Sequence, residues 1–183
     1  DRSAFFMVPH KASMIVKVSF SDDSMTGYSD WPTPLAETAP KFSGGAVADD
    51  GSLWFAPSSS PFILRFDPST DAMTGYTFRD RTDCCDSPTY NFAGAVNING
   101  IIWLCPYSAK AVVRVIPGNG GLTSYAEWPA GFNGKATAKF VSCTAVAEDI
   151  WFSPNEARAV VKFNTATGAM ASFDAWPQSS SVE

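Results

Sequence analysis

The chain has 183 residues, of which 45% are apolar and 14% aromatic, and it carries a formal net charge of −5. This composition is typical of a packed globular protein and not of a disordered chain. Like charges are not grouped anywhere along the sequence. The basic surface that binds a phosphate backbone is therefore missing, and we expect no nucleic-acid partner. No apolar stretch approaches the ~20 residues that cross a bilayer, so we expect no transmembrane segment.

One pattern occurs four times along the chain, with a period of 48 or 49 residues. Its markers are the prolines Pro9, Pro57, Pro106 and Pro154, the basic residues Lys17, Arg65, Arg114 and Lys162, and the aromatic residues Tyr28, Tyr76, Tyr125 and Phe173. Three markers in one register indicate a repeat, and this period is typical of solenoids, propellers and arrays. The copies span approximately 1–40, 41–88, 89–137 and 138–183 and form a single region, 1–183.

Each complete copy reads as four short strands in chain order. The first copy begins in the turn before its second strand, so it has no first strand of its own. The second copy has expected strands at 41–51, 52–57, 62–70 and 73–78, where the first ends in the turn Asp49-Asp50-Gly51 and the third in an Asp-Pro turn. The corresponding segments are 91–96, 100–106, 111–121 and 122–129 in the third copy, and 139–146, 149–154, 159–168 and 170–177 in the fourth.

Four antiparallel strands in ~48 residues match one blade of a propeller. The sequence therefore predicts an all-β fold, a β-propeller region of four blades, in which every blade except the first is a four-stranded antiparallel sheet. An open row of blades exposes strand edges and apolar faces at both ends. We therefore expect this region to be part of a larger propeller or to be completed by a partner.

The aromatic residues of the repeat have expected roles in packing. Trp54, Trp103 and Trp151, with Phe6 in the first copy, are expected to fill the space between neighbouring blades. Trp31, Trp128 and Trp176, each followed by proline, are expected to brace the blade edges. The basic residue of each third strand is expected to pair with an acidic residue of a turn, such as Asp67.

The four cysteines are Cys84, Cys85, Cys105 and Cys143, and their spacing matches no zinc or redox motif, so we expect neither a metal site nor a cofactor. Cys105 and Cys143 lie in apolar strands, where small buried hydrophobic side chains are the simplest interpretation. All four remain disulfide candidates with open pairing, including a bond between Cys84 and Cys85. Localisation also stays open, although paired cysteines would favour an extracellular or lumenal compartment.

The second and fourth copies, "GSLWFAPSSSPFILRFDPSTDAMTGYTF" and "DIWFSPNEARAVVKFNTATGAMASFDAWP", resemble the repeats of virginiamycin B lyase and NHL-type propellers. Those repeats read roughly G-x-(I/V/L)-W-F followed by I-x-R-(I/F)-D-P-x-T-G, and all four copies share the resemblance. It implies a propeller, and for the lyase subgroup a metal-assisted elimination by a His/Glu/His cluster. The sequence has a single histidine, His10, and no H-x-E or E-x-H stretch, so no catalytic residue is carried over.

The loops between the second and third strands are the expected binding surface. In a propeller they share one face with the loops that join the blades, and here they differ between copies, as expected where a repeated scaffold carries a binding function. The candidate residues are His10, Lys11, Tyr107, Lys110, Asn155 and Arg158. Tyr107 and Arg158 are the expected anchors because aromatic and guanidinium groups dominate binding hot spots.

No motif supplies a nucleophile or an orienting acid beside the single histidine, so we predict no catalytic residues. The main hypothesis is a non-enzymatic propeller that acts as a scaffold or protein-interaction module, or as a subunit of a larger assembly. Its partners would be another protein or the remaining propeller blades. Two alternatives stay open: a ligand- or glycan-binding propeller, and a fragment of a lyase-type propeller enzyme.

Overall fold

The computed structural model describes residues 3–33, 35, 39–78, 81–86 and 89–177. The strands form four antiparallel sheets, which we call blades 1 to 4, and within each sheet the strands follow one another in chain order. Blade 1 holds β1 (Ala4–Met7), β2 (Ile15–Ser19) and β3 (Met25–Tyr28), and blade 2 holds β4 (Phe42–Val47), β5 (Leu53–Pro57), β6 (Phe62–Asp67) and β7 (Ala72–Thr77). Blade 3 holds β8 (Phe92–Ile98), β9 (Ile101–Pro106), β10 (Val112–Ile116) and β11 (Gly121–Tyr125), and blade 4 holds β12 (Phe140–Val146), β13 (Asp149–Pro154), β14 (Val160–Asn164) and β15 (Met170–Phe173).

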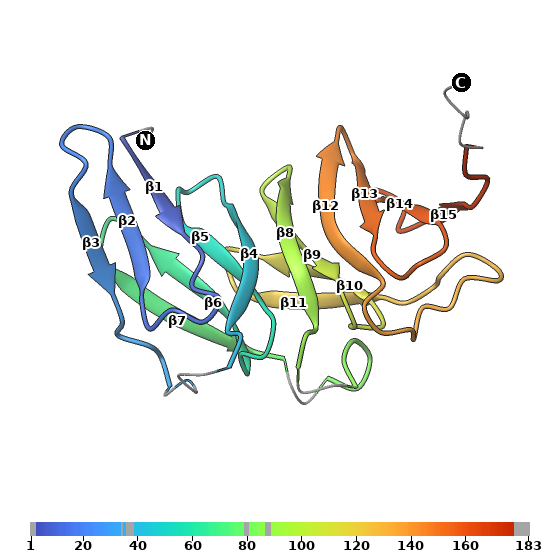
Figure 1. The fold of residues 1–183 in the computed structure, drawn as a ribbon, viewed down its shortest axis with the longest axis horizontal. Coiled ribbons are helices and arrows are strands. Elements are labelled where there is room, and N and C mark those ends of the chain that lie inside the picture. Colours follow the sequence, from blue (N-terminus) through green and yellow to red (C-terminus); the bar gives the residue numbers. More distant parts are fainter. Residues whose placement is uncertain (1–2, 34, 36–38, 79–80, 87–88, 178–183) are drawn as a thin grey trace, which may run out of the picture.

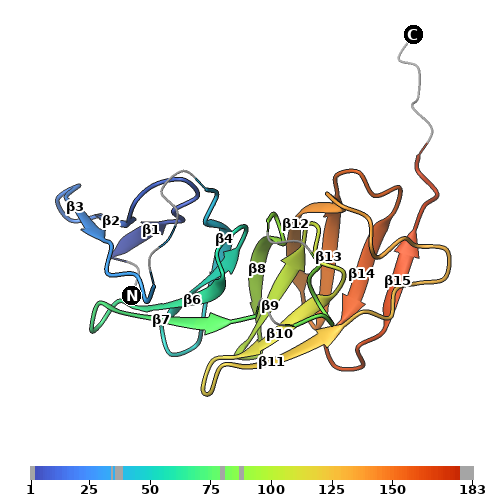
Figure 2. The same ribbon diagram turned by 90° about the horizontal axis from the view of Figure 1, so that it is seen from below.

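The blades stand side by side in chain order, and the two chain ends lie at opposite ends of the row (Figure 1). The strands β4, β8 and β12, which we call the inner strands, pack against one another. From below, the last strand of each blade lies on the outside of the row (Figure 2). The fold is thus the all-β partial propeller that the repeat predicts, and among the described residues blade 1 has three strands and no inner one. No helix among the described residues is long and apolar enough to cross a membrane.

The hairpin between β8 and β9 shows how the local sequence sets the blade. Asn99 and Gly100 both have positive φ angles, 53° and 75°. A two-residue type I′ turn requires positive φ at both positions, and Asn-Gly is its most favourable sequence. The side chain of Asn97 accepts a hydrogen bond from the Gly100 amide at 3.1 Å, which holds the turn. The chain therefore reverses at once, with Ile98 opposite Ile101.

Neighbouring blades are held together by aromatic side chains. Trp103 and Tyr125 of blade 3 both contact Phe163 of blade 4, at ring-centre distances of 5.2 Å each. At the first interface, Phe6 and Tyr28 contact Phe66 in the same way, at 5.7 and 4.8 Å. At these two interfaces one blade presents two rings, from β1 and β3 in blade 1 and from β9 and β11 in blade 3. A ring from the next blade, on β6 or β14, fills the space between them.

The second interface repeats this arrangement with a smaller partner. Trp54 and Tyr76 of blade 2 stack at 5.1 Å and pack in one cluster with Val115 of blade 3. Trp54 is fully buried and Trp103 nearly so, as predicted. Trp151, in contrast, is only half-buried, because no blade covers it within the described chain. It stacks on Phe173 of its own blade, at 5.4 Å.

The basic residue of each third strand lies opposite the aromatic residue of the second strand, as the register of Arg65 with Trp54 shows. Arg65 forms ion pairs with Asp50 at 3.1 Å and with Asp67 at 3.4 Å. In blade 4, Lys162 pairs with Asp149 at 3.4 Å. The expected pairing with acidic turn residues is therefore present in blades 2 and 4.

The tryptophans that follow the last strands of blades 1, 3 and 4 brace these blades through one repeated hydrogen bond. In each case the indole Nε1 donates to a backbone carbonyl oxygen 18 residues earlier, in the loop between the second and third strands. The pairs are Trp31 with Ser13 (3.2 Å), Trp128 with Lys110 (2.6 Å) and Trp176 with Arg158 (2.9 Å). The outer edge of the blade is thereby tied to its loop.

Two of the four disulfide candidates are paired with each other. Cys105 and Cys143 form a disulfide, with Cα atoms 6.0 Å apart, so the simpler interpretation of these two as separate buried hydrophobic side chains was wrong. The bond joins β9 of blade 3 to β12 of blade 4. The equivalent pair between blades 2 and 3 is Ala56 and Ala95, two small residues that pack in the same cluster. The disulfide is therefore a covalent version of a contact that the repeat already makes. Cys84 and Cys85 are free thiols.

Replacing a buried tryptophan should destabilise the fold far more than replacing its half-buried counterpart. We expect Trp103→Ala to lower the free energy of unfolding by about 3–5 kcal/mol, as emptying a buried aromatic site does. Trp151→Ala should cost about 1 kcal/mol or less, because its site is open to solvent on one side. Urea titrations measure both values. A loss below about 1 kcal/mol for Trp103→Ala would contradict the packing described here.

The inter-blade disulfide should also contribute measurably. Since the bond closes a segment with a sequence separation of 38, we expect the double substitution Cys105→Ala, Cys143→Ala to cost about 4 kcal/mol of unfolding free energy. Reductant should lower the stability of the wild type by a similar amount and leave the double variant unchanged. Cys85→Ser serves as the control and should keep the sensitivity to reductant.

Candidate functional site

A continuous belt of backbone hydrogen bonds connects the blades along one face. The residue before each inner strand donates its amide to the loop of the preceding blade: Lys41 to His10 O (2.6 Å), Asn91 to Ser58 O (3.0 Å) and Lys139 to Tyr107 O (2.8 Å). The carbonyl of the same residue accepts from its own blade: Lys41 from Ser58 N (2.9 Å), Asn91 from Tyr107 N (2.8 Å) and Lys139 from Asn155 N (2.8 Å). The loops between second and third strands are thereby fixed on one face.

The predicted binding residues therefore share this face, which we call the loop rim. His10, Tyr107 and Asn155 belong to the belt itself. Lys110 and Arg158 lie a few residues further along the same loops, and their carbonyls accept the bracing tryptophans. The carbonyl of Lys11 accepts a hydrogen bond from the Lys41 ammonium at 3.3 Å. The backbone of the rim is thus held rigidly from several sides.

The side chains of the loop rim differ in how far they are already engaged. The Nδ1 atom of His10 lies 3.0 Å from the carbonyl oxygen of Phe42, and Asn155 donates to the Ala138 carbonyl at 3.2 Å. Lys110 forms an ion pair with Asp86 at 2.6 Å. Tyr107 is half-buried, with its ring centre 6.3 Å from that of Tyr90, whereas the side chain of Arg158 is exposed. Tyr107 thus offers a supported aromatic surface.

Sequence reasoning missed the two buried lysines of the belt, Lys41 and Lys139; of these, Lys139 is fully buried. Its ammonium donates to the carbonyls of Ala109 and Ala136, both at 2.8 Å, and lies 5.9 Å from the ring centre of Trp128. Burial lowers its pKa to about 8, since a poorly solvated site disfavours the charged form. The available signal was that the residue immediately before each inner-strand phenylalanine recurs as lysine, asparagine and lysine.

The loop cysteines lie beside this belt. Cys84 is buried and its amide carbonyl accepts a hydrogen bond from Lys110 N at 2.8 Å. The hydrogen bond with Cys84 and burial both raise the pKa of the Cys85 thiol. Among the described residues, no three His, Cys, Asp or Glu side chains gather in a way that would hold a metal ion.

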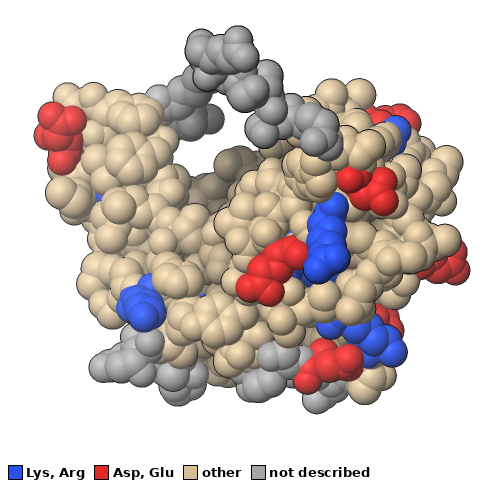
Figure 3. Space-filling model, turned by 45° about the vertical axis from the view of Figure 1, so that its right-hand side comes forward, with Lys and Arg blue, Asp and Glu red and all other residues tan. Residues whose placement is uncertain are grey.

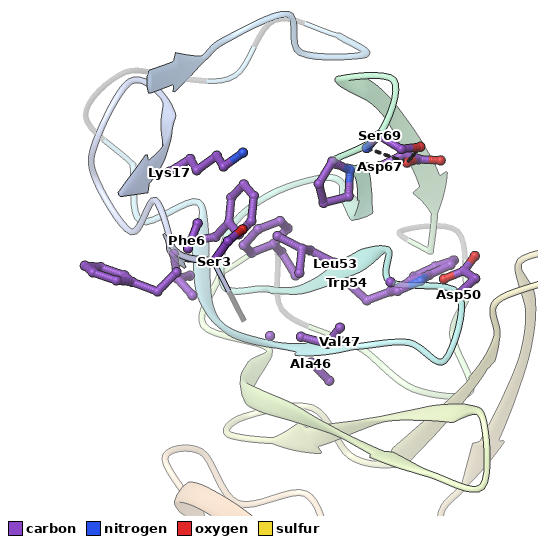
Figure 4. Close-up of a pocket in the computed structure, with 17 residues that line it drawn as sticks. Ser3, Phe6, Lys17, Ala46, Val47, Asp50, Leu53, Trp54, Asp67 and Ser69 are labelled. Atoms are coloured by element: carbon purple, nitrogen blue, oxygen red, sulfur yellow. Dashed lines mark hydrogen bonds between the residues drawn. The ribbon is translucent and has the colours of Figure 1, made fainter. Parts of the chain in front are cut away.

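A cleft of about 640 Å³ separates blade 1 from blade 2. Phe6 and Lys17 border it on the side of blade 1, and Leu53, Trp54 and Val47 border it on the side of blade 2 (Figure 4). The Lys17 ammonium lies 5.9 Å from the centre of the Phe6 ring. The turn residues Asp50, Asp67 and Ser69 border the same cleft (Figure 4). The lining is therefore apolar along the strands, with polar groups at the turns.

Comparison with known proteins shows what this architecture resembles. No family model matches the sequence, and no curated protein is significantly similar to it. Among solved structures, virginiamycin B lyase from Staphylococcus aureus superposes with a TM-score of 0.70 at 14% identity, over 96% of this chain and 53% of that one. A streptogramin B lyase gives 0.71 at 19% identity, over 93% and 51%, and the WD40 repeats of RRP9 give 0.65 at 13% identity, over 93% and 47%.

These similarities show the fold: a β-propeller like that of virginiamycin B lyase. The lyases and the WD40 protein share this architecture although one group is enzymatic by name, so the likeness does not assign an activity. The chain spans about half the length of the structures that it matches. Those structures therefore contain a comparable length of chain beyond the part that is equivalent to these four blades.

The buried lysine should make stability depend on pH in the alkaline range. Because folding lowers the pKa of Lys139 from its usual 10.5 to about 8, the unfolded state binds more protons between these values. The free energy of unfolding should therefore rise as the pH increases from about 8 to 10. Lys139→Met should remove this component of the slope. The two proteins are compared by the slope of their unfolding free energy against pH. Their absolute stabilities are not compared, because Lys139→Met also leaves the carbonyls of Ala109 and Ala136 without their donor. Parallel slopes for both proteins would contradict the assignment.

Proposed function

We propose that this chain is a non-enzymatic propeller module that binds protein, and that it forms one part of a larger assembly by docking further propeller blades onto its two ends. The observation that carries this proposal is that both end blades expose side chains that the repeat buries elsewhere. We call these surfaces the end faces. The outer face of blade 4 is one, and the outer face of blade 1 is the other.

The end face of blade 4 is an inter-blade surface without its cover. Val146 is 57% exposed, whereas the equivalent Ala48 and Ile98 are 5% and 6% exposed because the next blade packs on them. Phe173, at 49% exposure, stands with the half-buried Trp151 in the arrangement that receives a third-strand residue at the inner interfaces. The surface thus has the shape and chemistry to receive another blade.

The end face of blade 1 shows the opposite half of the same contact. Phe5 and Met7 are 46% and 51% exposed, whereas the equivalent Leu53 and Phe55 in blade 2 are buried at the first interface. Met25 on β3, the equivalent of Met73, is also exposed. The two end faces are therefore complementary in type, as the two sides of every internal interface are.

The visible surface supports association through apolar contact more than through charge. In Figure 3, basic and acidic residues are scattered over a face that consists mostly of other residues. Large apolar side chains on a soluble protein mark sites of association, particularly where several lie on one face. The loop rim is the proposed second surface for a protein partner, with Tyr107 and Arg158 as anchors supported by the rigid belt.

The proposal predicts that the isolated chain associates through its end faces. Light scattering coupled to gel filtration should show an apparent mass that rises with protein concentration. Val146→Glu and Phe173→Glu should each reduce this association, because they introduce a charge into an apolar contact. Both residues are exposed, so the monomer should remain folded.

The matched control is Thr123→Glu, which introduces the same charge at an exposed position of β11 in blade 3, between the two end blades. It should leave the concentration dependence unchanged. Docking through these surfaces would be contradicted if the chain stayed monomeric at all concentrations. It would also be contradicted if neither Val146→Glu nor Phe173→Glu reduced the association.

A further inference from the structure

The belt of backbone hydrogen bonds has three equivalent positions, which directly precede the inner strands β4, β8 and β12. Lys41 and Lys139 occupy the first and the third of these positions, and Asn91 occupies the second. All three residues are buried, with at most 3% of their surface exposed. Because their backbone groups make the same hydrogen bonds to the loops on either side, the three side chains leave the belt from equivalent points.

The two lysines show which kind of group this position stabilises. The Lys139 ammonium donates to the carbonyls of Ala109 and Ala136 at 2.8 Å, and the Lys41 ammonium donates to the Lys11 carbonyl at 3.3 Å. In both cases the positive group contacts the loop between the second and third strands of the preceding blade. A buried charge is tolerated where such oxygen atoms replace its water. The belt therefore holds a cation among backbone oxygen atoms at two of its three positions.

The position of Asn91 presents buried oxygen atoms instead of an ammonium group. Within the described part of the chain, neither Asn91 Oδ1 nor Ser58 Oγ has a hydrogen-bond partner. The two residues are direct neighbours, since the Asn91 amide donates to the Ser58 carbonyl at 3.0 Å, and they are only 2% and 1% exposed. A buried polar group without a partner is unfavourable, so two neighbouring ones indicate a binding site for a small polar species.

We propose that the belt binds a monovalent cation of the size of potassium between Asn91 and the loop of blade 2 that begins at Ser58. The ion occupies the place that corresponds to the lysine ammonium at the other two positions. An asparagine side chain is shorter than a lysine side chain and ends in an oxygen atom, so it serves as a ligand of the ion and does not supply the charge itself. Asn91 Oδ1 and Ser58 Oγ are the side-chain ligands.

The ligand atoms favour potassium over other ions. Both are uncharged oxygen atoms, and potassium is bound by rings of neutral oxygen atoms in proteins. A potassium ion is also close in size to an ammonium group. Calcium and magnesium are held through carboxylates, and no cluster of three His, Cys, Asp or Glu side chains that could hold a metal ion is found in the described ranges. An anion would be repelled by the same oxygen atoms.

A water molecule is the other small species that two buried oxygen atoms can bind. It differs from a cation in a measurable way, because its binding does not depend on which salt is dissolved. The experiments below therefore compare cations at a constant ionic strength, so that general screening of charges is the same in every sample.

The first test measures the thermal unfolding of the full chain while potassium chloride replaces N-methyl-D-glucamine chloride. The organic cation is too large for a buried site, so it serves as the reference. An ion that binds only the folded state stabilises it by mass action, and we expect a saturable rise of the Tm by about 2–4 °C. A Tm that is the same in both salts would overturn the proposal and indicate a water molecule.

Protein variants locate the bound ion. Asn91→Lys installs the residue found at the other two positions, so its own ammonium should replace the ion and the Tm should no longer depend on potassium. Ser58→Ala removes one ligand and should reduce the potassium-dependent rise by about half or more. Should Asn91→Lys fail to fold, as judged by circular dichroism, Ser58→Ala decides the question alone. A full rise in either folded variant would overturn the assignment.

The matched control is Asn119→Lys, which makes the same substitution at an exposed asparagine in the turn between β10 and β11. It changes the net charge equally and should keep the full potassium-dependent rise. Loss of the rise in this control would show a general effect of charge and overturn the proposal.

Crystals grown with rubidium in place of potassium identify the bound species directly, because rubidium scatters X-rays anomalously. We expect an anomalous peak in contact with Asn91 Oδ1 and Ser58 Oγ in the wild type, and none at this position in Asn91→Lys. A solvent peak without anomalous signal at this position in the wild type would identify water and overturn the proposal.

Discussion

The structure depends on a single contact, in which two aromatic rings of one blade receive a third-strand side chain from the next. Phe163 between Trp103 and Tyr125 is the most complete example. A four-stranded sheet of this size has apolar residues on both faces and cannot bury them by itself. Each blade is therefore stable only as part of a row, and the chemistry of each face is set by the neighbour that it must cover.

The hydrogen-bond belt adds direction to this apolar packing. Burial fixes how close the blades lie but is not directional, whereas the amide of the residue before each inner strand must meet one particular carbonyl on the preceding blade. The indole of Trp128 and the ammonium of Lys139 both bond to the same loop of blade 3, at Lys110 O and Ala109 O. These contacts hold the loops rigid without using their outward side chains, which can consequently differ from copy to copy.

The repeat made the fold predictable, because every copy carries the same strand and turn signals and each confirms the register of the others. Trp54 and Arg65 were assigned correctly since their roles are local to a blade and its neighbour. The disulfide was not predictable: whether Cys105 meets Cys143 depends on the register between strands of two different blades. The burial of Lys139 was missed because lysine is usually exposed and only its backbone-directed hydrogen bonds make burial possible. The cleft could not be predicted either, because its volume depends on the distance between two blades, and no sequence pattern specifies that distance.

The disulfide between blades 3 and 4 and the cleft between blades 1 and 2 give the row an uneven stiffness. One interface is covalently closed, and the interface at the other end lacks the packed pair of inner strands found elsewhere. The bond fixes the spacing of β9 and β12, whereas the first interface is held by ring contacts and backbone hydrogen bonds. We therefore expect the row to bend more easily next to blade 1 than between blades 3 and 4.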